Sequence, residues 1–433
     1  EGLSNAGEMG TNLIIVVNDN EMSIAENHGG LYQNLKELRD TEGRSSCNFF
    51  RSLGLDYLYV GEGNDIPSLV AAFAKVKDTS RPTVVHIHTQ KGKGYAPAEA
   101  DREEFHWEMP FDLETGKPKV DCSGMEDYHS LTGKFLLEKM KEDHTVVAIS
   151  SGTPTVIGFT PERRKQAGRQ FVDVGIAEEH AVALASGIAA GGGRPVYGVY
   201  STFIQRCYDQ LSQDLCINGN PAVITVFMGT VAGMNDVTHL GFFDIPLISN
   251  IPNMVYLAPT CSEEYFAMLE WAVRQTEYPV AIRVPGVAVV HRKEEFDTDY
   301  SELNRYKMTA RGETVAILAL GSFYDLGQAL KNKLREESGV EATLINPRYI
   351  TGLDEPMLEE LKVGHRIVVT LEDGVLDGGF GEKIARYYGN SEMRVLNYGL
   401  RKEFADRYNL DELMKANRLT DKQMAEDIAG ILE

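Results

Sequence analysis

Residues suited to hold a metal ion and a diphosphate follow the first apolar run of the chain. The segment Val17–Ile24 reads V-N-D-N-E-M-S-I. Carboxamide and carbonyl oxygens at the carboxyl end of a parallel strand suit a hard divalent cation, which can in turn bind a diphosphate. Taken alone, N-D-N is more often a turn whose side chains bond to their own backbone. The segment is therefore a candidate ligand site that needs support from the rest of the chain.

A second candidate, Thr89–Glu99, reads T-Q-K-G-K-G-Y-A-P-A-E and follows the apolar run T-V-V-H-I-H-T. Glycines beside lysines at the end of a strand let the backbone approach an anion closely. On spacing alone, a flexible basic surface turn fits equally well. His106 follows, and an isolated loop histidine is ordinarily only solvated.

A third candidate, Phe171–Val182 (F-V-D-V-G-I-A-E-E-H-A-V), has the pattern of a strand that turns into a helix. Glu178 near the helix start could merely complement the helix dipole. In Tyr200–Gln210 (Y-S-T-F-I-Q-R-C-Y-D-Q), the ring of Phe203 could stack on a flat heterocycle and Arg206 could reach an anion. Core packing is the usual fate of such aromatic rings.

Short β-branched runs that alternate with helical stretches must position these residues. This alternation is typical of an α/β fold with mainly parallel sheets covered by helices on both faces. Polar stretches at 112–124 and 291–307 divide the runs into three groups, so we expect three successive α/β domains at 1–120, 121–300 and 301–433. The runs are NLIIVV, TVVHIHT, TVVAIS, FVDVG, PVYGVY, AVITVF, VAILAL, ATLINP, RIVVTL and RVLNY.

The composition limits the classes of ligand and partner. A chain of 433 residues exceeds what one hydrophobic core usually organises. Its formal net charge of -21 disfavours nucleic acid and anionic membranes as partners. The five cysteines form no C-x-x-C pair, which fits a reducing cytoplasm, and no apolar run approaches the roughly 18 residues of a membrane span. The opening residues, E-G-L-S-N-A-G-E-M-G, look like the interior of a domain, so we expect that domain to be incomplete.

In order along the chain, these motifs resemble those of the 1-deoxy-D-xylulose-5-phosphate synthases, thiamine-diphosphate-dependent relatives of transketolase. The family patterns N-D-N-x-M-S-I, K-K-G-x-G-Y-x-P-A-E, I-A-E-x-H and Y-S-T-F-x-Q-R-A-Y-D-Q correspond to the segments above. Further on, LGSFYD, INPRYITGLD and LEDGVLDGGFG resemble the family's carboxy-terminal domain, whose role is structural and interfacial. We expect Asp373 and the glycines after it to lie in turns without a chemical role. The family's metal-binding G-D-G segment would lie just upstream of Glu1.

The resemblance implies a site for thiamine diphosphate and Mg²⁺. Asn20 would coordinate the metal through its side chain, and Met22 through its main-chain carbonyl. Glu178 would bind the aminopyrimidine ring of the coenzyme and drive removal of the thiazolium proton. The implied coenzyme-binding residues are Asn20, Met22, Ser23, Ile24, Lys91, Ile176, Glu178, Tyr200, Phe203 and Arg206.

The same resemblance implies a substrate site. His106 and His239 would join Glu178 as catalytic residues by moving protons. Substrate would be bound by Arg206, Asn235, Asp236 and His239. The implied reaction is a decarboxylating condensation of pyruvate with an aldehyde. In the family the aldehyde is glyceraldehyde 3-phosphate and the product is 1-deoxy-D-xylulose 5-phosphate, the entry to isoprenoid and thiamine synthesis.

The chain departs from the family at two arginines that bind the substrate phosphate. The family's D-R-A-G is replaced by a sequence with Met228, and its Y-P-R-G by one with Gly286. Each charge-assisted contact of this kind is worth roughly 1.5–3 kcal/mol, so their loss puts the phosphorylated acceptor in question. Arg206, Arg283 or Lys91 could substitute, and an unphosphorylated acceptor is equally open.

Two other functions stay open at this point. One is a transketolase-type transfer of a two-carbon ketol unit without pyruvate decarboxylation. The other is a non-catalytic paralogue that serves as an assembly subunit. For the synthase the resemblance implies a homodimer, because thiamine sites in this superfamily lie where diphosphate and pyrimidine domains meet.

Overall fold

The protein forms two compact units, Glu1–Met125 and Glu126–Glu433. The computed structural model describes residues 1–120, 124–284 and 288–432. Gly286 and residue 121, where we expect the second domain to begin, lie outside the described residues.

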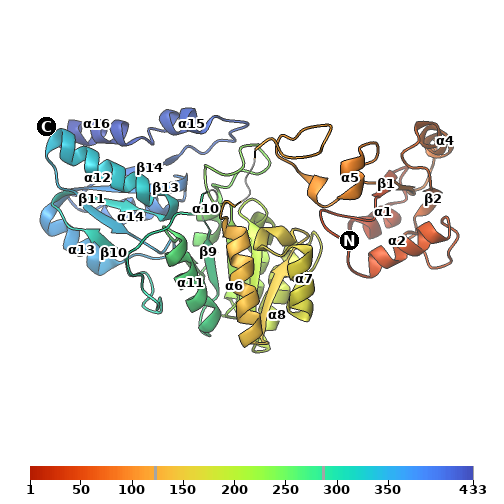
Figure 1. Ribbon diagram of the computed structural model, residues 1–433, viewed down its shortest axis with the longest axis horizontal. Coiled ribbons are helices and arrows are strands. Elements are labelled where there is room, and N and C mark those ends of the chain that lie inside the picture. Colours follow the sequence, from red (N-terminus) through yellow and green to blue (C-terminus); the bar gives the residue numbers. More distant parts are fainter. Residues whose placement is uncertain (121–123, 285–287, 433) are drawn as a thin grey trace. The chain divides into compact units, whose positions relative to one another are not determined.

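The first unit is built on a three-stranded parallel sheet of order β1-β3-β2. Helices cover both faces, because Ile15 packs with α2 and α3 whereas Val85 packs with α4 on the other side. The strands are β1 (Ile14–Asp19), β2 (Asp56–Val60) and β3 (Thr83–His88). The helices are α1 (Gly2–Met9), α2 (Gly30–Asp40), α3 (Phe49–Ser52), α4 (Ile66–Val76), α5 (Ala96–Ala100) and the short η1 (Glu104–His106) (Figure 1).

Parallel pairing brings the carboxyl ends of β1 and β3 together. Asp19, the last residue of β1, pairs with His88, the last residue of β3. The candidate segment Val17–Ile24 spans the end of β1, and Thr89–Glu99 follows the end of β3. They therefore share one edge of the sheet, where parallel α/β sheets ordinarily bind their ligands.

The second unit begins with a six-stranded parallel sheet of order β5-β4-β6-β7-β9-β8. Val223 packs with α6 and α11, whereas the next residue, Ile224, packs with α8, so both faces are buried. The strands are β4 (Val146–Ser150), β5 (Phe171–Asp173), β6 (Arg194–Tyr200), β7 (Val223–Phe227), β8 (Val255–Leu257) and β9 (Val280–Arg283). The helices are α6 (Tyr128–Glu142), η2 (Pro154–Ile157), α7 (Pro161–Ala167), η3 (Gly168–Gln170), α8 (Glu178–Ala190), η4 (Ile204–Cys207), α9 (Tyr208–Gln210), η5 (Leu211–Cys216), α10 (Asp244–Ser249) and α11 (Ser262–Arg274) (Figure 1).

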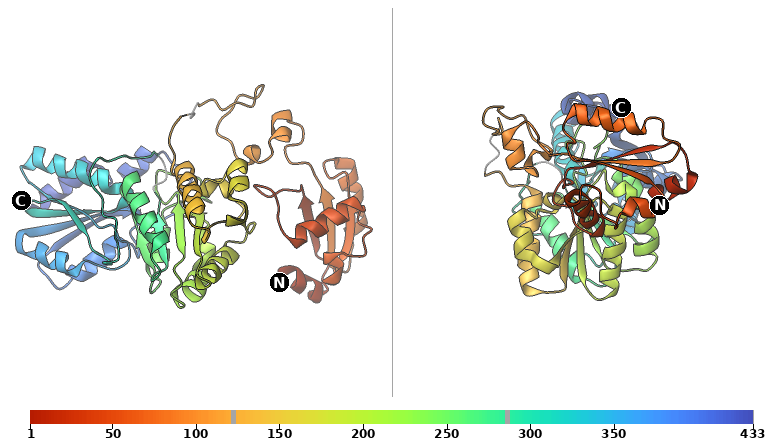
Figure 2. Two further views of the ribbon diagram at one scale, coloured as in Figure 1. Left: turned by 60° about the horizontal axis from the view of Figure 1, so that its bottom comes forward. Right: turned by 90° about the vertical axis from the view of Figure 1, so that its right-hand side faces the viewer.

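A five-stranded sheet of order β10-β12-β11-β13-β14 completes the second unit. Strand β10 runs antiparallel to β12, and the other pairs are parallel. Figure 2 shows helices on both sides of this sheet. The strands are β10 (Lys307–Ala310), β11 (Thr314–Ala319), β12 (Thr343–Asn346), β13 (His365–Val375) and β14 (Arg394–Leu400). The helices are η6 (Gly321–Phe323), α12 (Tyr324–Ser338), α13 (Glu355–Gly364), α14 (Phe380–Tyr388), α15 (Leu410–Ala416) and α16 (Asp421–Leu432).

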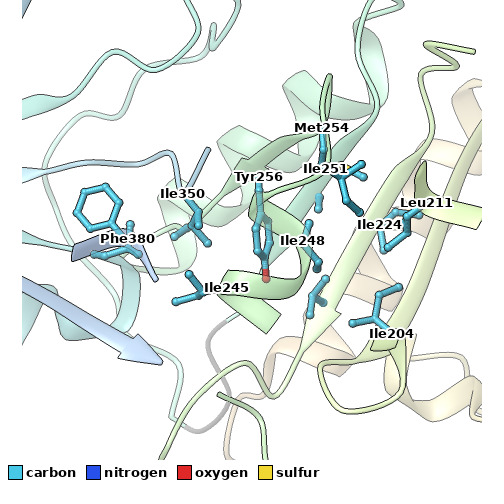
Figure 3. Close-up of a cluster of buried hydrophobic side chains, with 14 of the residues drawn as sticks. Ile204, Leu211, Ile224, Ile245, Ile248, Ile251, Met254, Tyr256, Ile350 and Phe380 are labelled. Atoms are coloured by element: carbon cyan, nitrogen blue, oxygen red, sulfur yellow. The ribbon is translucent and has the colours of Figure 1, made fainter. Parts of the chain in front are cut away.

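A continuous apolar core joins the two sheets of the second unit. Figure 3 shows the buried ring of Tyr256 between Ile248 on one side and Ile350 and Phe380 on the other. Burial of each large apolar side chain contributes about 1.5–3 kcal/mol, so this shared core couples the two sheets strongly. The expected division of this unit near residue 300 stays a prediction.

The α/β fold with mainly parallel sheets confirms the expectation from the alternating runs. The runs did not reveal β2, β8, β9 and β10. Strand β8 has three residues and β9 has four, and β10 begins at Lys307 inside a polar stretch, so their periodicity is too short to recognise.

The expectation that Asp373 and Gly374 lie in a turn is wrong. Both belong to β13, and Asp373 is buried. Its carboxylate accepts the N–H of Val231 and the hydroxyl of Ser322, each at 2.7 Å. Hydrogen bonds from elsewhere in the unit therefore replace the solvent that an acidic residue usually finds in a turn.

Candidate active site

Glu178 begins α8, directly after β5 at the edge of the six-stranded sheet. The intervening loop is held by Asp173, whose Oδ1 accepts the N–H groups of Gly152 and Gly175, each at 2.8 Å. Gly152 has φ of +81°, and an added Cβ would lie 2.9 Å from the exposed side chain of Ile176. The turn after β4 therefore requires glycine at position 152, where it packs against the loop that leads into the helix of Glu178.

The carboxyl of Glu178 is buried and pairs with Arg206. The side chain of Glu178 is 3% exposed, whereas that of Arg206 is 52% exposed. Nη1 of the guanidinium donates to both carboxylate oxygens, at 3.1 and 3.3 Å. A protected acid and a half-exposed cation thus lie together beyond the carboxyl ends of β5 and β6, where a ligand is expected.

Phe203 lies in a small group of rings. Its centroid is 5.6 Å from that of Tyr200 and 5.6 Å from that of His239, both in edge-on geometry. Burial raises the pKa of Tyr200, so its hydroxyl stays protonated. The structure thus brings together three candidates: Tyr200 at the end of β6, Phe203 just after it and His239 in the loop after β7.

The loop after β7 carries Asn235, Asp236 and His239. Nδ1 of His239 lies 2.7 Å from the hydroxyl of Thr238 and 3.3 Å from Oδ1 of Asp236. Hydrogen bonds from Thr238, and then from His239, hold the pKa of Asp236 below its ordinary value. Nε2 of His239 is therefore the nitrogen available for a reacting group. The side chain of Asn235 donates to the carbonyl of Tyr408 at 3.1 Å, so this residue anchors the loop.

Arg283 does not replace a lost phosphate-binding arginine, and that suggestion from the sequence is wrong. Its side chain is buried, with Nε and Nη2 donating to Asp244 at 2.7 and 3.1 Å. Nη2 also donates to the carbonyls of Gly241 at 3.4 Å and Asp373 at 2.5 Å. Burial opposes its charge, but Asp244 and Asp373 outweigh burial and raise the pKa of Arg283. Its hydrogen bonds go to Asp244, Gly241 and Asp373, so the guanidinium stabilises the end of the loop after β7 and does not face a ligand.

In the first unit, the side chain of Asn20 forms a turn with its own backbone. Its Oδ1 accepts the N–H of Met22 at 3.0 Å, and Glu21 between them has φ of +68°. The turn is compatible with metal binding, because a carboxamide oxygen has a second lone pair. Among the residues that the structure describes, no group of three His, Cys, Asp or Glu could hold a metal ion. Asn20 and Met22 would therefore supply part of a coordination shell.

Lys91 ties the two candidate segments of the first unit together. Its Nζ donates to the carbonyls of Ser23 at 2.8 Å and Ile24 at 3.2 Å. Burial lowers the pKa of Lys91, while Glu103 opposes that shift. Burial, and then the positive charge of Lys91, lower the pKa of His106. His106 is therefore neutral at pH 7 and able to accept a proton.

A buried polar chain in the first unit escaped the sequence analysis. Asp19 accepts from Arg39 at 2.5 Å and lies 2.9 Å from Nε2 of His86, whose Nδ1 is 2.7 Å from the hydroxyl of Tyr57. Burial opposes ionisation, but the hydrogen bonds of His86 and Arg39 prevail and lower the pKa of Asp19 to about 2. Asp19 and Arg39 also line a cavity of about 330 Å³. His86 could have revealed this chain in the sequence, because a histidine inside an apolar strand needs a buried hydrogen-bond partner.

These residues fit thiamine diphosphate and a divalent metal ion. A buried carboxyl near an aromatic ring, as at Glu178 and Phe203, suits an aminopyrimidine. The hard oxygens of Asn20 and Met22 suit Mg²⁺, and Lys91 brings a positive charge to the same segment. Glu178 and Asn20 belong to different units, so their sharing of one coenzyme stays a prediction.

Comparison with known proteins defines the class. Residues 126–289 match the pyrimidine-binding domain of transketolase, residues 305–424 the transketolase C-terminal domain, and residues 1–47 the 1-deoxy-D-xylulose-5-phosphate synthase description. A transketolase from Pichia stipitis in complex with sedoheptulose 7-phosphate has a TM-score of 0.59 at 15% identity, over 99% of this chain and 74% of that one. A split-gene transketolase, an inactive β4 tetramer, has a TM-score of 0.58 at 23% identity, over 69% and 95%. Fold and domains thus define a transketolase-like enzyme.

Curated relatives narrow that class to one family. The 1-deoxy-D-xylulose-5-phosphate synthase of Lachnoclostridium phytofermentans is 33% identical over 98% of this chain and 74% of its own length. The synthase of Clostridium acetobutylicum is 32% identical over 100% of this chain and 74% of its own length. The chain belongs to the 1-deoxy-D-xylulose-5-phosphate synthase family, whose members are transferases that use thiamine diphosphate with a divalent metal ion such as Mg²⁺. The sequence-based expectations of family, fold, enzyme class and cofactors are confirmed.

Proposed function

We propose that the protein condenses pyruvate with an aldehyde, with loss of CO₂, to give 1-deoxy-D-xylulose 5-phosphate for isoprenoid and thiamine synthesis. The buried carboxyl of Glu178, paired with Arg206 at the start of α8, carries this proposal. Thiamine diphosphate, when bound, supplies the electron sink that decarboxylation of a 2-oxo acid requires. The chain's own residues bind, orient and move protons.

In the second unit, Glu178 holds the aminopyrimidine edge of the coenzyme by a hydrogen bond. Its burial keeps water from competing for that bond. Phe203 stacks on the ring, and Ile176 and Tyr200 complete the binding surface. Arg206 is half-exposed, and its guanidinium has further donors for the carboxylate of pyruvate.

Histidines move the remaining protons. Nδ1 of His239 is engaged by Thr238 and Asp236, so Nε2 gives a proton to the carbonyl oxygen of the aldehyde as it becomes a hydroxyl. His106, whose pKa is lowered by burial and then by Lys91, is assigned the role of a proton acceptor in the reaction. Asn20 and Met22 hold the metal ion, while Lys91 positions the segment that contains Ser23 and Ile24.

The choice of aldehyde acceptor depends on how the chain binds a phosphate group. Glyceraldehyde 3-phosphate is the acceptor of the family, and Asn235 and Asp236 are proposed to help bind it. Met228 brings no hydrogen-bond donor to the position of a family arginine, and Arg283 is committed to Asp244. An unphosphorylated aldehyde is therefore the specific alternative.

The proposal extends to domains, assembly and location. Residues 1–120 belong to the diphosphate-binding domain, 121–300 form the pyrimidine-binding domain and 301–433 the transketolase C-terminal domain. We infer a cytoplasmic homodimer. Support comes from the transketolase-like fold and from Cys47, Cys207, Cys216 and Cys261, which are free thiols. In the part of the chain that the structure describes, no helix is long and apolar enough to cross a membrane.

The test is to incubate the full-length protein with pyruvate, Mg²⁺ and thiamine diphosphate against a panel of phosphorylated and plain aldehydes. We expect CO₂ release and a ketose product that require all components. If CO₂ is released only with plain aldehydes, the acceptor is an unphosphorylated aldehyde and not glyceraldehyde 3-phosphate. Transfer of a two-carbon unit from a ketose donor without CO₂ would identify a transketolase-type enzyme, and absence of coenzyme binding would identify an assembly subunit.

A further inference from the structure

The loop that carries His239 is held by distant segments of the second unit. We call residues 228–241, between β7 and α10, the histidine loop. We call residues 401–409, between β14 and α15, the carboxy-terminal strap. Hydrogen bonds join the strap to the histidine loop at several points, although the two segments lie far apart in the sequence.

The peptide groups at Val231 are held on both sides. The hydroxyl of Tyr408 in the strap donates to the carbonyl of Val231 at 2.6 Å. The N–H of Val231 donates to Oδ1 of Asp373 in β13 at 2.7 Å, and Ser322 holds the other oxygen of that carboxylate at 2.7 Å. Val231 is itself buried, so neither peptide group could turn to solvent if its partner were removed.

The middle of the histidine loop is held by the strap backbone. The N–H of Arg407 donates to the carbonyl of Asn235 at 2.6 Å. The side chain of Asn235 donates back to the carbonyl of Tyr408 at 3.1 Å. Oδ1 of Asp406 accepts the N–H of Val237 at 3.2 Å. These bonds fix the loop just before His239.

The far end of the loop meets the region around Glu178. Thr202, which follows β6, donates its hydroxyl to the carbonyl of Thr238 at 3.1 Å. The ring of His239 packs edge-on against Phe203. His239 therefore follows a stretch of the loop that the strap holds at Val237, and its ring packs against Phe203.

We propose that Tyr408 and Asp373 are positioning residues for His239, so that the carboxy-terminal part of the chain sets the geometry of proton transfer in the active site. This inference rests on the proposed function, because it takes His239 as the proton donor to the aldehyde. A displacement of about 1 Å at a reacting group can cost about 10²-fold in rate, so a loop without helix or strand needs such anchors. Burial, and then the charge of Asp373, raise the pKa of Tyr408 to about 12, which keeps its hydroxyl a donor at neutral pH.

The main test compares Tyr408→Phe with a matched control, Tyr388→Phe, in the full-length protein with thiamine diphosphate and Mg²⁺. Tyr388 is buried, whereas Tyr408 is partly buried, and the hydroxyl of Tyr388 likewise donates to a main-chain carbonyl, that of Leu358 at 2.7 Å. Each variant thus loses a short bond from a tyrosine hydroxyl to a main-chain carbonyl, and Tyr408→Phe also loses a longer contact of 3.5 Å with the carbonyl of Met234. We expect Tyr408→Phe to lower kcat about tenfold, with KM for pyruvate and coenzyme affinity changed less than about twofold. The control should stay within about twofold of the parent in all three values.

A double-mutant cycle distinguishes positioning from a general effect on the fold. If Tyr408 acts through His239, Tyr408→Phe should lower the residual kcat of His239→Asn by less than about twofold. An equal loss in both backgrounds, or an equal loss in the Tyr388→Phe control, would overturn the proposal.

Hydrogen exchange supplies a readout that does not depend on activity. Amides at 231–239 should exchange faster in Tyr408→Phe but not in Tyr388→Phe, and unchanged exchange would also contradict the proposal. If Tyr408→Phe does not fold, Asp406→Ala, which removes the acceptor at an exposed strap residue, should lower kcat about threefold and speed exchange at Val237. If the parent protein releases no CO₂ from pyruvate, the proposed function fails, while the exchange experiment still tests the strap.

Discussion

The region around Glu178 and the histidine loop meet where Phe203 contacts His239, but their support comes from different distances along the chain. Asp173 holds Gly152 from 21 positions away, and Arg206 pairs with Glu178 from 28 positions away. In the histidine loop, Asp373 and Tyr408 hold Val231 from 142 and 177 positions away. The first region keeps the motifs of its family, whereas the second departs from them at Met228. In this protein, the region held by residues that are near in the sequence keeps the family motifs. The loop held by residues far along the chain departs from them.

The largest expected effect tests the locally built region. Glu178→Gln keeps the shape of the side chain but removes its acid–base function, so kcat should fall about 10³–10⁴-fold. CO₂ release from pyruvate is the measurement, and circular dichroism checks the fold. Glu179→Gln, at the exposed neighbouring residue, is the matched control and should retain activity. Near-normal turnover by Glu178→Gln would refute the assigned role.

Arg283→Met tests the base of the histidine loop. It leaves the carboxylate of Asp244 buried without its cation, so the free energy of unfolding should fall by about 3–5 kcal/mol. Denaturant titration measures this loss, and Arg274→Met, at an exposed helix end, should show little change. If stability holds and acceptor affinity falls instead, Arg283 is a substrate ligand after all.

His239→Asn compares the chemistry of the two regions directly. An asparagine preserves a polar side chain but cannot transfer a proton, so kcat should fall about 10²-fold, less than for Glu178→Gln. Coenzyme affinity, measured by calorimetric titration, should be unchanged because Glu178 and Phe203 are intact. His144→Asn at an exposed position serves as the control. A strong loss of coenzyme affinity would show that His239 binds the coenzyme and not the substrate.

Met228→Arg has the smallest expected effect. It tests whether methionine in place of the family arginine in the histidine loop determines which aldehyde is accepted. A restored guanidinium should improve kcat/KM for glyceraldehyde 3-phosphate relative to glyceraldehyde about tenfold, the worth of one charge-assisted contact. Met234→Arg places the same charge elsewhere in the loop and should leave the ratio within about twofold. An unchanged ratio in Met228→Arg would show that phosphate is held elsewhere or not at all.

Local patterns allowed much of this protein to be predicted. Strands such as β4, β7 and β11 appear as β-branched runs, because a strand buried on both faces is apolar along its length. The contacts of Lys91 with Ser23 and Ile24 show two separately recognised motifs in one cluster. That outcome follows from parallel pairing of β1 with β3, which brings their carboxyl ends together.

Other features were not predictable because they depend on burial. Asp373 follows a strand-like run and precedes glycines, as turn residues often do, yet its partners Val231 and Ser322 place it within β13. Arg283 looks like a free cation in the sequence, and only the buried carboxylate of Asp244 shows that it is committed. A charged residue enters the interior only with a partner, and sequence does not name that partner.

The sequence by itself determined the family, the coenzyme class and the identities of the candidate residues, because these reside in short motifs whose spacing is set by single turns and strand ends. Only the tertiary structure decided how those residues are held. Glu178 pairs with Arg206, and Arg283 is bound to Asp244 and so does not reach the site. The loop of His239 is bonded to Tyr408 and Asp373. The physical reason is that hydrogen bonds between distant segments form only once packing has buried both partners away from water.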